Sequence, residues 1–281
     1  MKKYWLIIAV LLLSGCTSRL AYNNLDWLVY WYMDDYVELT DSQEVIFDKK
    51  LAKWIEWHRN EQLQLYSMQL KQLRQHVQNN TLNKQTIAQQ LDQAQAHLIT
   101  LRNKLAPELA QLATQLSDDQ VIYLFAAISK DNREKQDSLN ELKALSAQAR
   151  YDQISEDIEE EFEERLGSLT DTQQALIREY ARHFTSTREN WLAYRVAMQN
   201  EARKLFSGRA DNPAFSQQLT QLLQNPDDYR SPEYLQQRQH NRQAYLELAS
   251  RVADTMTTQQ KDHVEELLSE LLEDIEALQE P

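Results

Sequence analysis

The chain has only three glycines and five prolines among its 281 residues. Tight β-hairpins, phosphate-binding loops and nucleophile elbows depend on glycine for backbone angles that other residues avoid. The shortage of glycine argues against all three, whereas good helix formers such as leucine, alanine, glutamine and glutamate are abundant. The sequence therefore predicts an all-α protein, an elongated bundle of long antiparallel helices.

Cysteine is nearly absent as well, since Cys16 is the only one. A single cysteine excludes an internal disulfide and a metal site built on several cysteines. The six histidines are scattered singly, and neither His-Glu-x-x-His nor Gly-x-Ser-x-Gly occurs. We therefore predict no catalytic residues, no metal, no cofactor and no small-molecule substrate. The alternative is a cell-wall-acting enzyme with a catalytic glutamate, although no flanking pattern singles one out.

The amino terminus has the organisation of a secretory signal. Two lysines at positions 2 and 3 precede an apolar stretch over residues 4–13, which is too short to span a bilayer. Residues 13–16, Leu-Ser-Gly-Cys, resemble the lipobox of bacterial lipoproteins, in which the signal is removed and the cysteine is acylated. The resemblance implies a signal peptide over residues 1–15 and a lipid anchor on Cys16. The alternative is an ordinary secreted protein whose cysteine is unmodified.

The resemblance also implies a location. In lipoproteins of this kind an aspartate after the acylated cysteine usually signals retention in the inner membrane, and here Thr17 takes that place. We therefore expect a protein anchored to the outer membrane and facing the periplasm. Loss of the two signal lysines changes the formal net charge from -13 to -15. Such an acidic body should not bind nucleic acid or an anionic lipid surface.

Aromatic residues are concentrated in residues 22–32, directly after the predicted anchor. Leu25, Leu28, Trp31 and Tyr32 fall at spacings of three and four, which places them on one face of a helix. We expect a core helix packed against its own domain. The alternative is a helix that faces a membrane interface or a partner, with Trp27 and Trp31 in the contact.

A second candidate surface follows at residues 54–59. Trp54 and His58 share a helical face, and Trp57 points away from both. Trp57 and Arg59, together with the aromatic helix, could anchor a partner protein, since tryptophan and arginine are common in interface hot spots. The alternative is that these residues lock the first two helices together.

The same helix-start pattern occurs four times, at residues 39–43, 116–120, 169–173 and 256–260. Each has an apolar residue, a hydroxyl residue, two polar residues and glutamine, which is the pattern of a capping box. The pattern also resembles the Leu-Thr-x-x-Gln motif of the Spy-type periplasmic chaperones. That resemblance implies an alternative function, a holdase that binds unfolded clients.

Apolar periodicity predicts the helices between these starts. A stripe over 41–77 predicts one long helix, and apolar residues from Ile87 to Leu105 repeat at about 3.5 residues, as in a helix laid along another. Pro107 should kink or restart that helix. The helix that begins at the second capping box runs on to Gly167, and a further stripe continues to Phe206. We place a boundary after residue 168, which predicts two packed helical halves, 16–168 and 169–281.

Residues 156–164 carry the densest charge in the chain. We interpret this segment as a solvated helix face. The alternative is a surface, including Glu159 and Glu160, that docks a basic partner or loosely binds divalent cations.

Several short motifs together resemble an uncharacterised family of all-helical lipoproteins from Gram-negative bacteria. They include the lipobox, Trp31-Tyr32, the box at 39–43, Trp54-x-x-Trp57-His58-Arg59 and Ser231-Pro232-Glu233-Tyr234. The resemblance implies location and fold and assigns no activity. We therefore expect a membrane-anchored protein with a non-catalytic interaction or structural role, whose partner is another envelope protein.

Overall fold

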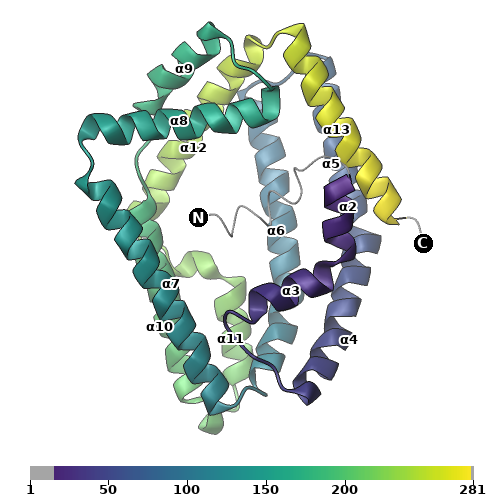
Figure 1. Cartoon of the computed structure of the whole chain (residues 1–281), viewed down its shortest axis with the longest axis vertical. Helices are drawn as coiled ribbons and strands as arrows, with labels where there is room; N and C mark the ends of the chain where they lie inside the picture. Colours follow the sequence, from purple (N-terminus) through teal and green to yellow (C-terminus); the bar gives the residue numbers. More distant parts are fainter. Residues whose placement is uncertain (1–15, 280–281) are drawn as a thin grey trace.

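The computed structural model describes residues 16–279, so the predicted signal peptide lies outside the described residues. The described part of the chain is helical and contains no strand, which confirms the all-α prediction. Figure 1 shows the helices as the sides of an open frame, with α8 across the upper end, α7 and α10 along one long side, and α4, α5 and α13 along the other. The elements are α2 (Cys16–Asn23), α3 (Leu25–Met33), α4 (Asp41–Trp57), η1 (His58–Gln62), α5 (Leu63–Gln78), α6 (Lys84–Ala113), α7 (Asp118–Ala144), α8 (Ala147–Leu166), α9 (Asp171–Ala181), α10 (Arg188–Ser207), η2 (Arg209–Asp211), α11 (Phe215–Gln224), η3 (Pro226–Tyr229), α12 (Pro232–Asp254) and α13 (Thr258–Gln279).

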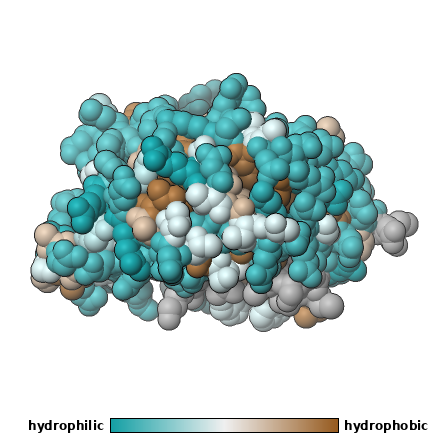
Figure 2. All heavy atoms as spheres, turned by 90° about the horizontal axis from the view of Figure 1, so that it is seen from above, coloured by the Kyte–Doolittle hydropathy of each residue, from teal (hydrophilic) through white to brown (hydrophobic). Residues whose placement is uncertain are grey.

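Buried apolar residues form three separate clusters. The upper core joins α8, α9 and α12, the lower core joins α6, α7, α10 and α11, and the α4 core packs against α3 and α6. Figure 2 shows a face that is mostly hydrophilic, with hydrophobic side chains gathered near its centre and a few more at its edges. Buried members include Ile177 and Leu248 of the upper core, Ala110 and Phe215 of the lower core, and Phe47 and Trp54 of the α4 core.

The predicted division into halves 16–168 and 169–281 is not confirmed. Helices from the two predicted halves pack directly on one another, α11 along α6 and α13 along α5. The upper core likewise joins α8, which precedes the predicted boundary, to α9 and α12, which follow it.

All four predicted capping boxes are present. Thr40, Ser117 and Thr170 each accept a hydrogen bond from the backbone N–H three residues on, and the glutamine at that position accepts one from the cap's own N–H. Thr257 and Gln260 make the same two bonds, at 3.2 and 3.0 Å. The repeated pattern therefore marks the starts of α4, α7, α9 and α13.

The boxes also meet in pairs, which the sequence did not predict. At the lower end of the frame, the Gln43 and Gln120 side-chain amides donate to each other's Oε1 at 3.1 and 2.7 Å. Gln43 Nε2 also donates to the carbonyl of Gln115 at 2.8 Å, and Gln120 Nε2 donates to the carbonyl of Glu38 at 2.6 Å. Each carbonyl lies two residues before the partner's cap, so the arrangement is reciprocal. We call it the lower clasp.

The second pair of boxes repeats this geometry at the upper end and is more deeply buried. Gln173 and Gln260 exchange amide hydrogen bonds at 2.9 and 2.8 Å. Their Nε2 groups also donate to the carbonyls of Thr255 and Ser168, at 3.4 and 2.7 Å. Gln173 is 0% exposed and Gln260 is 3% exposed. In this upper clasp the Nε2 donor and the Oε1 acceptor of each amide are both hydrogen-bonded, as burial of an amide requires.

One continuous helical rod runs from Asp41 to Gln78, as predicted for 41–77. Its centre is η1, a π-helical turn over His58–Gln62 in which the N–H of Leu63 reaches the carbonyl of His58. A π-turn accommodates one extra residue per turn and therefore shifts the face that later side chains occupy. The polar run over residues 59–62 interrupts the apolar stripe here, and after it Leu63 is buried whereas Leu65 is 43% exposed.

Pro107 does not restart the helix, which corrects part of the prediction for that residue. α6 runs without interruption from Lys84 to Ala113 with Pro107 inside it. Proline cannot donate to the carbonyl four residues earlier, which belongs to Asn103. Gln224 of α11 donates to that carbonyl at 3.3 Å. A neighbouring helix thus replaces the bond that proline removes.

Two predicted continuous segments are broken. The helix expected to run from the second box to Gly167 is divided at Leu145, because Ser146 caps a new helix by accepting from the N–H of Ala149 at 3.1 Å. The stripe that continues to Phe206 spans α9 and α10, separated by a loop. Asn241 holds this loop by two hydrogen bonds with the backbone of Thr185, at 2.9 and 2.7 Å.

The 3.5-residue repeat of α6 is only partly covered by other helices. Ile87 packs on the upper core and Leu105 on the α4 core. Between them Ala94 is exposed and Leu98 is 68% exposed. The repeat therefore packs on other helices at the two ends of α6, whereas at the centre α5 contacts α6 through His97 and Gln90, which lie outside the repeat.

The upper clasp gives a prediction about stability. Gln173→Ala should lower the free energy of unfolding by about 1–3 kcal/mol, because it leaves the buried amide of Gln260 without its partner. Gln43→Ala is the matched control in the less buried lower clasp, and its cost should be smaller. Urea unfolding of the single variants and of Gln173→Ala/Gln260→Ala checks this. Strictly additive costs for the pair would contradict a coupled clasp.

Candidate functional site

Side-chain contacts from α13 and from the π-turn hold the amino-terminal helix α2 to the body. Arg19 Nε donates to Oδ1 of Asp274 on α13 at 2.7 Å, and the Asp274 side chain is 7% exposed. The Tyr22 hydroxyl lies 2.9 Å from Nδ1 of His58 at the start of the π-turn. Asp274, near the carboxyl terminus, and His58 of the π-turn thus hold the helix that begins at Cys16.

His58 is the centre of a chain of polar and aromatic side chains. Its Nε2 lies 3.2 Å from the hydroxyl of Tyr66, so a tyrosine stands at each ring nitrogen. The Tyr66 ring packs edge-on against His97, with the centroids 4.7 Å apart. His97 Nε2 lies 2.9 Å from Oε1 of Gln69. Neutral imidazole has one donor and one acceptor, which suits one tyrosine on each side.

Burial shifts the pKa value of each of these groups in the direction that favours its neutral form. The pKa of His58 and that of His97 are lowered because burial penalises the charged imidazolium. Burial raises the pKa of Tyr22 and of Tyr66, and the Arg59 guanidinium opposes the rise at Tyr22. At neutral pH the cluster is uncharged. Its hydrogen bonds hold α2 against the π-turn.

Arg59 and Trp57 flank this cluster. The Arg59 guanidinium lies 5.6 Å from the centre of the Tyr22 ring and donates to Oδ1 of Asn23 at 3.4 Å. Trp57 is half-buried, with its indole N–H donating to Glu61 at 3.0 Å and the Lys104 ammonium 5.3 Å from its ring. Arg59 therefore contacts the amino-terminal helix through Tyr22 and Asn23. Arg59 and Trp57 are both engaged inside the chain, which favours the locking alternative.

Trp27 and Trp31 form a separate, exposed pair on α3. Their rings stack with centroids 6.4 Å apart and planes 16° apart, and they are 61% and 47% exposed. The opposite face of α3 packs against the α4 core through Val29, Tyr30 and Met33. The helix thus packs on the core, but not through the predicted face, since Trp31 of that face is exposed together with Trp27.

Glu159 and Glu160 lie on α8, at the upper end of the frame in Figure 1. Glu159 is paired with Arg178 at 3.2 Å, whereas Glu160 is exposed. Ile158 and Phe162 on the same helix are buried in the upper core. This pattern fits a solvated helix face. Across residues 16–279, no group of three His, Cys, Asp or Glu side chains converges as metal ligands.

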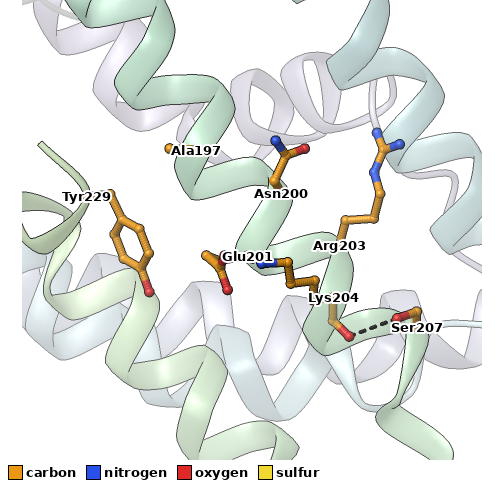
Figure 3. A pocket seen from close by; sticks show the side chains of 7 residues that line it. All are labelled: Ala197, Asn200, Glu201, Arg203, Lys204, Ser207 and Tyr229. Carbon is orange, nitrogen blue, oxygen red and sulfur yellow. Dashed lines mark hydrogen bonds and ion pairs between the residues drawn. The ribbon is translucent and has the colours of Figure 1, made fainter. Parts of the chain in front are cut away.

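A hollow of about 670 Å³ lies along α10. In Figure 3, Glu201 and the Lys204 ammonium lie on the side of this helix toward Tyr229, and Asn200 points away from that ring. Lys204 pairs with Glu201 at 2.5 Å, and Arg203 donates to Ser129 at 3.1 Å while its guanidinium lies over the Phe125 ring. The Lys204 and Arg203 side chains that line the hollow are thus already engaged with protein groups. The residues that line it include no nucleophile in contact with a base.

The model described as "Family of unknown function (DUF6279)" matches residues 35–235. The chain belongs to this family. No curated protein and no solved structure matches it. The DUF6279 match includes α4, the π-turn and the lower clasp, whereas Cys16, Trp27 and Trp31 precede it.

Membership of DUF6279 confirms that the family resemblance is to an uncharacterised family. The lipoprotein character and the Spy-type similarity stay predictions. No helix within residues 16–279 is both long and apolar enough to cross a membrane.

The sequence pointed to His58 and Arg59 and missed the groups that meet them. Tyr22, Tyr66 and His97 come from three helices, and only the fold brings them together. The Arg19–Asp274 pair, separated by 255 residues, was also missed. The polar interruption after His58 was the one local signal of the π-turn.

The lowered pKa values predict acid sensitivity. An unfolded histidine titrates near pH 6.5, so below that pH the unfolded chain binds more protons than the folded chain, in which His58 and His97 resist protonation. The free energy of unfolding should therefore fall as the pH is lowered from 7.5 through 6.5 toward the folded pKa. His58→Gln should make this dependence shallower, and His58→Gln/His97→Gln shallower still. Urea unfolding at a series of pH values checks this, and identical slopes would refute it.

Proposed function

We propose that this protein is a non-catalytic lipoprotein, anchored through Cys16 to the outer membrane and facing the periplasm, that binds another envelope protein. The proposal combines the lipobox resemblance of residues 13–16 with the way α2 begins at Cys16 and is fastened to the body.

The observation that carries the partner contact is the exposed centre of α6. A 3.5-residue apolar repeat is typical of a helix that packs lengthwise on another helix. Ile87 and Leu105 have such packing, and Ala94 and Leu98 between them do not. A leucine that is 68% exposed in the middle of such a seam supports docking of a partner's amphipathic helix.

A holdase is the second candidate, from the resemblance to the Leu-Thr-x-x-Gln motif. The clasps give that motif a structural role here, since Gln43, Gln120, Gln173 and Gln260 are engaged with one another. The specific-partner function is therefore favoured. If the purified body suppressed aggregation of several unrelated unfolded clients, the holdase function would be favoured instead. Turnover abolished by one glutamate or histidine replacement, with the fold preserved, would establish an enzyme.

The anchor is tested by Cys16→Ser. The wild-type protein should fractionate with outer membranes, and mass spectrometry should find an acylated amino-terminal cysteine. The variant should be unprocessed at this site or released from the membrane, because acyl chains are what would hold the body there. A wild-type chain with an unmodified thiol would overturn the anchor.

The partner contact is tested by Leu98→Glu. A charge in the centre of an apolar seam should reduce recovery of the crosslinked partner severalfold, since the carboxylate would lose its water in the complex. Ile122→Glu on α7 is a matched control, because Ile122 is 67% exposed and lies outside the seam. Both variants should retain the helical circular dichroism of the wild type. Equal recovery with Leu98→Glu and Ile122→Glu would exclude the seam as the contact.

A further inference from the structure

We propose that α3 is a second point of membrane attachment, which lies along a zwitterionic lipid surface with Trp27 and Trp31 in the headgroup zone. The inference rests on the proposed lipid anchor at Cys16. It assigns the tryptophan pair to lipid, while the α6 seam contacts the protein partner.

The distance along the chain brings the pair to the membrane. α2 begins at Cys16, so no spacer separates the acylated residue from the first helix. Trp27 lies 11 residues further on, which is at most about 17 Å if the whole segment rises as a helix. The headgroup regions account for the difference between a hydrocarbon core of about 30 Å and a bilayer of about 40–45 Å. Each leaflet's headgroup zone is therefore about 5–7 Å deep, and a connection of at most about 17 Å is long enough for α3 to reach it.

The orientation of α3 is fixed by the body. The Tyr30 hydroxyl donates to Asp48 at 2.6 Å, and its ring meets Phe47 edge-on. With α2 held by the Arg19–Asp274 pair, the two helices cannot rotate freely about the anchor. The tryptophan face of α3 is thus held outward, and Leu20 on α2 is also 66% exposed.

The chemistry of this face selects the kind of surface. Tryptophan favours the membrane interface because its ring is apolar and its N–H remains close to water. Asp26 and Asp34 are exposed beside the pair. Carboxylates would be repelled by anionic lipids and not by zwitterionic ones. The occupant is therefore a phosphatidylcholine-like or phosphatidylethanolamine-like surface.

Tryptophan fluorescence of the mature lipidated protein tests the inference. The protein is reconstituted in phosphatidylcholine vesicles whose acyl chains carry bromine, which quenches nearby indoles. The mature chain has five tryptophans, of which Trp54 is buried and Trp57 half-buried. Wild-type fluorescence should be quenched, and Trp27→Phe/Trp31→Phe should lose most of this quenching. Trp191→Phe is the control, because it removes a tryptophan of α10 and should retain the quenching.

Vesicle flotation separates the inference from the proposed function on which it rests. Quenching that depends on the pair, in protein that floats, supports the inference. If the protein floats but its indoles are not quenched and remain accessible to acrylamide, α3 does not contact lipid, and the inference is wrong while the anchor stands. If the protein does not float, the anchor itself fails.

Discussion

The fold depends on glutamine amides that hold helix starts together. In the lower clasp, Oε1 of each glutamine completes that residue's own capping box, and its Nε2 donates to the carbonyl two residues before the partner's cap. The lower clasp joins the starts of α4 and α7, and the upper clasp joins those of α9 and α13. Three separate cores, each small, would leave the frame poorly defined without such links at its ends. Directional hydrogen bonds supply the geometry that apolar packing alone does not specify.

Local signals in the sequence were sufficient for most of the helices. The four capping boxes and the stop at Gly167, whose φ is +81°, are all decided by residues within one helical turn. Their energetics need no knowledge of the rest of the chain. The breaks at Leu145 and between α9 and α10 were missed because the apolar stripe continues across them. What divides these helices is a single serine cap in one case and Asn241 of a distant helix in the other.

The site was harder to predict because its parts are far apart in the chain. His58 and Trp57 stood out as residue types, yet their roles depend on Tyr22, Tyr66 and Lys104, which no spacing rule connects to them. The same limit applies to the clasps. Four similar pentapeptides predict four helix starts, and nothing within a pentapeptide says which one it will meet. The exposure of Trp27 and Trp31 likewise depends on which face of α3 the α4 core covers.

Pro107 has a consequence for local unfolding. The carbonyl of Asn103 is satisfied by a side chain of α11, so α6 has its complete set of hydrogen bonds only while α11 is in place. Dissociation of α11 would weaken α6 near Pro107 as well as uncovering apolar surface. The two helices, more than a hundred residues apart, should therefore open as a single cooperative unit in native-state hydrogen exchange. The carboxyl-terminal part of α6 is therefore rigid only while α11 is packed against it.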